Sequence, residues 1–346
     1  MLRLPDFEYH QPGSVDEAVS LLADHDQGGA LAVAGGTDVY PKMKRKQFRP
    51  DAVVSLADIE GMAGIRDEGE DGVVIGAQAT LDTIANDPTI AARYPAVAEA
   101  TGAVATPSIR RMGTIAGNLC QDPRCDKYDQ PLEWRESVDW CWKAPGREGW
   151  PPEDVTEDDI PCRVAPGAGR CWANYSSDSA PALIAHGAEV TLVGGDGERT
   201  VPLAELFVDD GIDPLDKAPE ELITHLRLPP ANGTKSTYRK LKPRASIDFP
   251  EMGVAVAVEA ADDGTVEDAR IVFTAVGSCP KLADDAAEAL VGEAPDGDLI
   301  EEVGQLASRA TQPMDNTAYH PTYRKQMAAV YTERALGDLL GVEADA

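Results

Sequence analysis

The sequence has few basic residues for its length. Its 346 residues include 31 Lys and Arg against 60 Asp and Glu, which gives a formal net charge of -29. Such a surface repels phosphate backbones and anionic headgroups, which excludes nucleic acid and membrane surfaces as partners. The acids are spread through patterned segments, which indicates an ordered acidic surface. Two explanations stay open: ordinary solubility, and a halophilic, salt-rich cytoplasm whose ions screen the self-repulsion.

Long apolar runs are also missing. No stretch approaches the length of a membrane span, and the first residues lack the apolar core of a secretion signal. We therefore expect a cytoplasmic protein, and thiols stay reduced in that compartment. Its 6 cysteines are accordingly expected to act as metal or redox ligands before disulfides.

Most of the cysteines, and every tryptophan, lie in or next to one window over residues 120–172. The window has no long apolar period and is repeatedly interrupted by proline, so it cannot order itself by burying an apolar core. Four thiolates on one inorganic centre would supply the missing constraint. The tryptophans would then either keep solvent away from that centre or anchor the window to the body of the protein.

Four of these cysteines are separated by 16, 21 and 9 positions: Cys125, Cys141, Cys162 and Cys171. This spacing differs from the short knuckles of structural zinc and from the compact run of bacterial ferredoxins. Spacing alone leaves three alternatives open, namely an iron–sulfur cluster, a zinc ion, or thiols without a metal. We expect Cys120 and the remote Cys279 to be buried residues outside any ligand set.

Two segments rich in small residues suit the phosphates of a dinucleotide. The first follows an apolar strand over 31–34, and its two glycines, Gly35 and Gly36, let successive main-chain N–H groups form an anion nest. The second, expected to be a turn over 113–118, adds a hydroxyl and an amide. Arg110 and Arg111 precede it and either bind an anion or pair at the surface. A Gly-Gly turn is more often purely structural, so neither motif decides the function alone.

Short strands mixed with short helices predict an α+β fold in place of a regular doubly wound sheet. A domain boundary is expected in the Pro- and Gly-containing stretch 229–236. Beyond it, the turn ADDGTV joins two strands as a hairpin, and helices are expected over 281–290, 299–310 and 323–340.

Taken in order, these segments resemble the FAD-binding (medium) subunit of the molybdenum hydroxylase family, which includes carbon monoxide dehydrogenase and xanthine dehydrogenase. The resemblance covers about residues 7–340. It implies a PCMH-type FAD-binding domain over 1–228, with lobes at about 1–57 and 58–228. A C-terminal α+β domain over 229–346 would follow.

The resemblance also implies the residues that hold FAD. AGGTD looks like the first pyrophosphate loop, and TIAGN looks like the second, although alanine stands where glycine is usual. SDSAPAL resembles the segment that fixes the ribityl chain, ELITHLRLP the strand on the adenine side, and YRKLKPRASIDFP the basic stretch near the flavin. The implied contacts are Ala34, Gly35, Gly36, Thr37, Asp38, Val104, Thr114, Ala116, Gly117, Asn118, Asp178, Ile223 and Lys240.

The cysteine window looks very like an insertion in the β subunit of 4-hydroxybenzoyl-CoA reductase, which carries an extra 4Fe-4S cluster. Carried over, the ligands are Cys125, Cys141, Cys162 and Cys171. One departure is the acidic, proline-rich stretch GREGWPPEDVTEDDIP between the second and third ligands, which looks longer than the family loop.

This resemblance implies an electron-transfer subunit of an oxidoreductase, with FAD and a 4Fe-4S cluster and with no catalytic acid, base or nucleophile of its own. The implied partners are a molybdopterin-binding large subunit, which transforms the substrate, and a 2Fe-2S small subunit. Ferredoxin or another electron carrier and a dimer of heterotrimers are further expectations.

Three rival interpretations stay open. The first is the medium subunit of a xanthine, carbon monoxide or aldehyde dehydrogenase-like enzyme that passes electrons to an external acceptor. The second is a free-standing flavin oxidase, although the sequence shows no histidine-based covalent flavin site and no clear substrate-pocket residues. The third is a zinc-stapled interaction module without a redox role.

Overall fold

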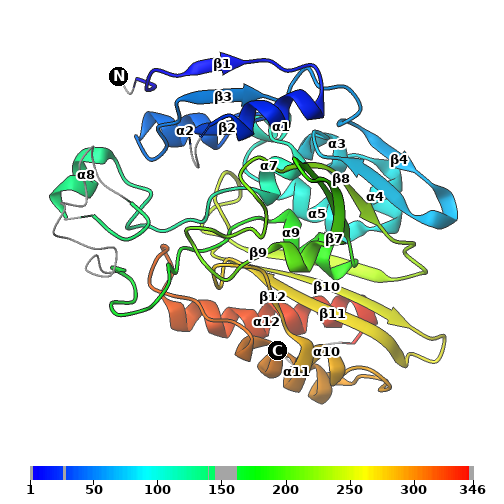
Figure 1. Cartoon of the computed structure of the whole chain (residues 1–346). Helices are drawn as coiled ribbons and strands as arrows, with labels where there is room; N and C mark the ends of the chain where they lie inside the picture. The colour runs from blue at the N-terminus through cyan, green and yellow to red at the C-terminus, as the bar shows by residue number, and fades with distance from the viewer. Residues whose placement is uncertain (1–2, 26–28, 139, 145–161, 343–346) are drawn as a thin grey trace.

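The computed structural model describes residues 3–25, 29–138, 140–144 and 162–342 (Figure 1). The acidic, proline-rich stretch over 146–161 therefore lies outside the described residues. None of the described helices combines the length and the apolar character required to cross a bilayer.

The chain begins with a small parallel sheet in the strand order β1-β3-β2. Its strands are β1 (Glu8–His10), β2 (Ala30–Val33) and β3 (Ala52–Ser55), and two helices accompany them, α1 (Val15–Ala23) and α2 (Val39–Lys44). Ser14 begins α1 because its side chain accepts a hydrogen bond from the N–H of Glu17. The turn between β2 and α2 is the first small-residue segment, and we call residues 34–38 the first loop.

The middle of the chain forms an antiparallel sheet in the order β4-β5-β8-β6-β7. Prolines occupy the first turn of α4, α5 and α6, where a missing N–H costs nothing, and they divide this region into short helices. The elements are β4 (Ile65–Asp67), η1 (Gly69–Asp71), β5 (Val73–Gly76), α3 (Leu81–Ala85), α4 (Pro88–Arg93), α5 (Pro95–Gly102), α6 (Pro107–Arg110), α7 (Ile115–Leu119), α8 (Leu132–Ser137), α9 (Ser179–Ala185), β6 (Glu189–Gly194), β7 (Gly197–Pro202), η3 (Leu203–Leu206) and β8 (Leu222–Leu228).

The last part is an antiparallel sheet in the order β12-β11-β10-β9 with helices beneath it (Figure 1). The elements are β9 (Lys235–Leu241), β10 (Met252–Ala260), β11 (Val266–Thr274), β12 (Lys281–Leu282), α10 (Asp284–Glu288), α11 (Gly297–Arg309) and α12 (Pro321–Leu340). A helix was expected over 281–290, but the prediction is wrong for its first residues. Lys281 and Leu282 pair with β11 and extend the sheet before α10 begins.

Strand β10 shows how this sheet is covered on both faces. Val254, Val256 and Val258 point into the core shared with α10–α12. Ala255 and Ala257 point into the core of the preceding domain, where α9 packs against β10 and β11. The alternation follows the two-residue period of a strand, and small side chains on one face let a helix approach closely. The α+β fold class expected from the sequence is confirmed.

Buried hydrogen bonds join α9 to the C-terminal sheet. His186, at the end of α9, lies 2.8 Å from the hydroxyl of Ser236 on β9, and that hydroxyl also accepts the N–H of Ala96 at 3.1 Å. The ring of Tyr94 meets the imidazole edge to face. Burial and, to a smaller extent, the charge of Arg270 together lower the pKa of His186 to about 4, so the folded protein holds this histidine neutral.

We expect His186 to make the unfolding free energy depend on pH below about 6.5, the ordinary histidine pKa. The unfolded chain takes up a proton there and the folded chain does not, so stability is lost as the pH falls towards 4. Between pH 7 and pH 4.5, wild type should lose roughly 2–3 kcal/mol more than His186→Asn. Urea unfolding at both pH values measures the difference. His320→Asn, at an exposed position, is the control, and equal losses in wild type and His186→Asn would contradict the assignment.

Candidate functional site

The structure brings the first loop against the segment that precedes the second small-residue region. A Cβ added at Gly35 would lie 1.8 Å from the carbonyl oxygen of Met112, so only glycine allows this approach. Gly36 has a φ of +67°, and a Cβ there would meet the ring of Tyr40 at 2.4 Å. Both glycines are therefore required by the local structure as well as suited to a ligand.

The main-chain N–H groups of the first loop are available to a ligand. Across the described part of the chain, no protein acceptor takes the main-chain N–H groups of Gly35, Gly36, Thr37 and Asp38. Unpaired N–H groups on consecutive residues are what an anion nest offers to phosphate oxygens. The loop can therefore bind a pyrophosphate.

The second region differs from its prediction, because it forms the start of helix α7 where a turn was expected. Thr114 caps this helix, and its hydroxyl accepts the N–H of Gly117 at 3.2 Å. The N–H groups of Ile115 and Ala116 donate to the carbonyls of Ala79 and Ala77. These N–H groups already have partners within the protein, so the first loop is the better candidate for phosphate contacts.

Asn118 connects α7 to the predicted ribityl segment. Its Oδ1 accepts hydrogen bonds from the hydroxyls of Ser177 at 2.7 Å and Ser179 at 2.6 Å. Asp178 lies between these two serines in the sequence, so these hydrogen bonds hold the segments 114–118 and 177–183 side by side. Two segments that contact the same ligand must lie next to each other in this way.

Asp178 and Lys240 form a buried ion pair. Lys240 Nζ lies 2.9 Å from one carboxylate oxygen of Asp178 and donates to the carbonyl of Ala103 at 3.0 Å. The hydroxyl of Tyr238 donates to the other oxygen at 2.7 Å. Burial raises the pKa of Asp178, and Lys240 and Tyr238 oppose that rise. Lys240 thus brings a fixed positive charge next to the predicted flavin contacts.

The backbone around Val104 is strained. Arg110 donates to the carbonyl of Val104 at 2.8 Å, and the next residue, Ala105, has a φ of +44°. Its carbonyl accepts the N–H of Ile247, which has a φ of +71°. Strained non-glycine residues concentrate at ligand clamps, which agrees with a binding site at this place.

Ile223 was predicted to contact the adenine side of FAD. In the structure its side chain belongs to the hydrophobic core.

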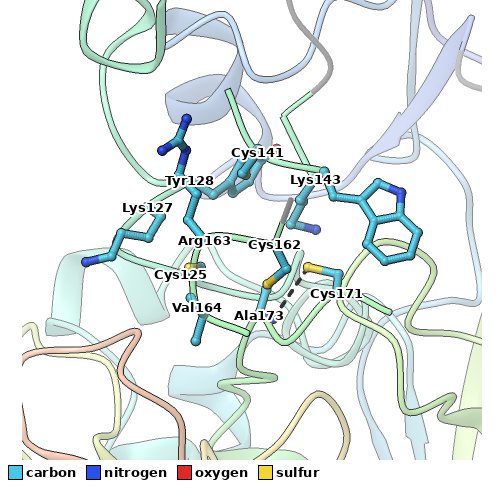
Figure 2. A pocket seen from close by; sticks show the side chains of 11 residues that line it. Cys125, Lys127, Tyr128, Cys141, Lys143, Cys162, Arg163, Val164, Cys171 and Ala173 are labelled. Atoms are coloured by element: carbon cyan, nitrogen blue, oxygen red, sulfur yellow. Dashed lines mark hydrogen bonds between the residues drawn. The ribbon is translucent and has the colours of Figure 1, made fainter. Parts of the chain in front are cut away.

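The four predicted metal ligands line one cavity, shown in Figure 2. All four thiols are buried and free of disulfides: Cys125, Cys141, Cys162 and Cys171. Cys120 is exposed and Cys279 is half-buried, so the expectation that both are buried is wrong. Among the described residues, no three His, Cys, Asp or Glu side chains are arranged to hold a single metal ion.

Burial disfavours negative charge on these sulfurs, and nearby groups oppose it only in part. Burial raises the pKa of Cys171 to about 11, although Lys143 opposes that rise. Burial also raises the pKa of Cys125 and of Cys141, and main-chain N–H groups near their sulfurs oppose the rise. The N–H of Ala173 lies 3.5 Å from Cys171 Sγ. Four cysteines around one cavity, with N–H groups near the sulfurs, are the kind of donor set that an iron–sulfur cluster uses.

Partly buried ion pairs connect the cysteine segment, residues 120–172, to the first loop and α2. Asp38 pairs with Arg124, the residue before Cys125. Lys42 on α2 pairs with Asp122. Arg124, Lys42 and Asp122 belong to none of the motifs that predict a site. The only signal that could have found Arg124 and Asp122 is that each is a charged residue inside a window that lacks an apolar core.

The fold and these two sites define a flavoprotein of the dinucleotide-binding α+β class. A family model described as the FAD binding domain in molybdopterin dehydrogenase matches residues 5–231. A second, the CO dehydrogenase flavoprotein C-terminal domain, matches residues 236–339. The chain belongs to the FAD-binding medium subunits of the molybdenum hydroxylase family.

Individual relatives agree with this family. The chain is 30% identical to the carbon monoxide dehydrogenase medium chain of Afipia carboxidovorans, over 95% of each chain. It is 27% identical to the aldehyde oxidoreductase FAD-binding subunit PaoB of Escherichia coli, over 96% of this chain and 97% of that one. The solved carbon monoxide dehydrogenase of Hydrogenophaga pseudoflava superposes with a TM-score of 0.78 at 28% identity, over 98% and 99% of the two chains.

We expect Gly35→Ala to lose both FAD and stability, because its methyl group would overlap the carbonyl of Met112. Overpacking of this kind costs about 1–3 kcal/mol of unfolding free energy. Urea unfolding and flavin absorbance per chain measure the two effects. Gly195→Ala is the matched control, since a Cβ there meets nothing within 4 Å. A Gly35→Ala protein with full flavin content would rule out the close approach.

Proposed function

We propose that this chain is the FAD-binding electron-transfer subunit of a molybdenum enzyme similar to 4-hydroxybenzoyl-CoA reductase, with an additional 4Fe-4S cluster. The observation that carries the proposal is the cavity lined by Cys125, Cys141, Cys162 and Cys171 in a chain of the FAD-binding medium subunits. Bound FAD exchanges electrons singly or in pairs and a cluster exchanges one, so a chain holding both can convert between the two modes.

The residues of this chain would bind and orient the flavin. The N–H groups of the first loop would take the pyrophosphate. Asp178 would fix the ribityl chain, and Lys240 would favour negative charge on the reduced flavin through its own positive charge. We propose that the binding domain covers residues 1–228, with lobes at about 1–57 and 58–228, and that residues 229–346 form the C-terminal domain.

The four cysteines would hold the cluster, and the basic side chains around them support electron exchange with an acidic carrier. Lys127 and Arg163 line the cavity, and the guanidinium of Arg170 lies 3.7 Å from the ring centre of Trp172, the residue after Cys171. Basic groups are scarce in this acidic chain, so their position next to the cysteines favours a carrier such as ferredoxin. A molybdopterin-binding large subunit and a 2Fe-2S small subunit complete the proposed enzyme.

A second candidate function rests on the relatives. Carbon monoxide dehydrogenase medium chains and an aldehyde oxidoreductase subunit match almost the whole chain, which favours an oxidative enzyme that sends electrons outward to an acceptor. The visible spectrum of anaerobically purified protein tests the cofactor content of both. Flavin bands with broad iron–sulfur absorbance support the cluster, flavin bands alone support the second candidate, and neither would leave only a structural module such as a zinc-stapled one.

We expect Cys141→Ser to lower the iron content while leaving FAD bound, because Cys141 lines the cavity and the first loop does not depend on it. Cys120→Ser is the matched control, since Cys120 is exposed and does not line the cavity. Iron, zinc and flavin per chain measure the outcome in both variants. Unchanged iron in Cys141→Ser would remove Cys141 from the ligand set, and zinc in place of iron in wild type would favour a structural site.

A further inference from the structure

Lys143 is a buried cation beside the four cysteines. Its side chain is 5% exposed, and it lines the cavity together with all four thiols (Figure 2). Its ammonium group donates to Asp122 Oδ1 at 2.5 Å and to the carbonyl of Gly211. Gly211 touches the cysteine site directly, because a Cβ added there would lie 2.7 Å from Cys171 Sγ. The ammonium group is therefore anchored to the residue that packs on one of the proposed ligands.

Asp122 holds Lys143 in place together with a second lysine. The other oxygen of Asp122 pairs with Lys42, whose side chain is fully buried. Lys42 also lies 3.3 Å from Asp129. Both ammonium groups lie near the ring of Tyr128, with Lys42 Nζ 4.9 Å and Lys143 Nζ 5.1 Å from the ring centre. With two donated hydrogen bonds and an aromatic neighbour, the ammonium group of Lys143 has a defined position.

Ion pairs link Lys143 to five further charged side chains, and the three positive and three negative charges sum to zero. The six groups lie at different distances from the cavity. Only Lys143 among them lines it. The others reach from the first loop to the cysteine segment: Asp38, Lys42, Asp122, Arg124 and Asp129. Because electrostatic energy falls with distance and is large where water is excluded, a charge placed in the cavity then experiences Lys143 more strongly than its compensating partners.

The geometry points to Lys143 as the residue that sets the reduction potential of the cluster held by the four cysteines. This inference rests on the proposed function. Reduction adds one negative charge to the cluster, and a buried cation next to it stabilises that state and raises the potential. The acidic chain, with its net charge of -29, works in the opposite direction, so a local cation compensates for the overall field.

Lys127 provides a matched comparison. It is the same residue type and lines the same cavity, but its side chain is 34% exposed and pairs with Asp126 at 3.1 Å. Solvent and salt screen an exposed charge, so Lys127 should influence the potential much less. Arg163, the remaining basic side chain of the lining, donates to the carbonyl of Trp140 at 2.6 Å and is left unchanged in the test.

The test is a redox titration, followed by electron paramagnetic resonance, of the iron-loaded full-length protein purified anaerobically. We expect Lys143→Met to disfavour reduction of the cluster by at least tenfold, which lowers a one-electron midpoint potential by 59 mV. Lys127→Met should change the same equilibrium less than threefold. Lys143→Arg, which keeps the charge, should also stay within threefold of wild type. Asp122 retains Lys42 as a partner in Lys143→Met, so the substitution does not leave that carboxylate unpaired.

An unchanged potential in iron-loaded Lys143→Met, or equal shifts in the two Met variants, would overturn the inference. If Lys143→Met loses its iron, Asp122→Asn gives the same test with the opposite sign: a higher potential supports the inference and an equal or lower one overturns it. Wild-type protein that binds flavin but no iron would overturn the proposed cluster itself. That result is distinct from an iron-loaded protein whose reduction potential does not depend on Lys143.

Discussion

The buried carboxylate of Asp122, shared by Lys42 and Lys143, is the constraint on which the rest of this site depends. Lys42 lies on α2 and Lys143 lies in the cysteine segment, residues 120–172, so one side chain joins that segment to α2. Burial raises the pKa of Asp122, but the two ammonium groups lower it below its ordinary value. Removing Asp122 would deprive both lysines of this carboxylate, and an uncompensated buried charge costs about 3–5 kcal/mol.

The cysteine segment is also held from the C-terminal domain. Asn316 donates to the carbonyl of Trp172 at 2.6 Å, and Ser278 donates to the carbonyl of Cys171 at 3.1 Å. The segment therefore contacts the parts of the chain on both sides of it in sequence, and it lies at one side of the molecule (Figure 1). The pair of Asp38 and Arg124 also joins the first loop to the residue that precedes Cys125.

The two sites use different physical means to prepare for a ligand. The first loop depends on glycine, because the backbone of Gly35 must approach Met112 and its N–H groups stay free for an acceptor. The four-cysteine cavity depends on charge, because burial raises the pKa of its thiols while N–H groups and an ammonium group oppose that rise in part.

Local signals were enough to predict the α+β class, the glycines of the first loop and the four cysteines, because glycine patterns, strand and helix periods and cysteine spacing can be read without the fold. Resemblance added Asp178 and Lys240, which the structure joins in one ion pair. Three features emerged from the folded chain alone. Residues 115–119 form a helix whose first N–H groups are already bonded, Ile223 faces the core, and Lys42 and Lys143 meet at Asp122. Those outcomes depend on segments up to about a hundred residues apart, and no local pattern encodes which distant partner a buried charge or a free N–H group will find.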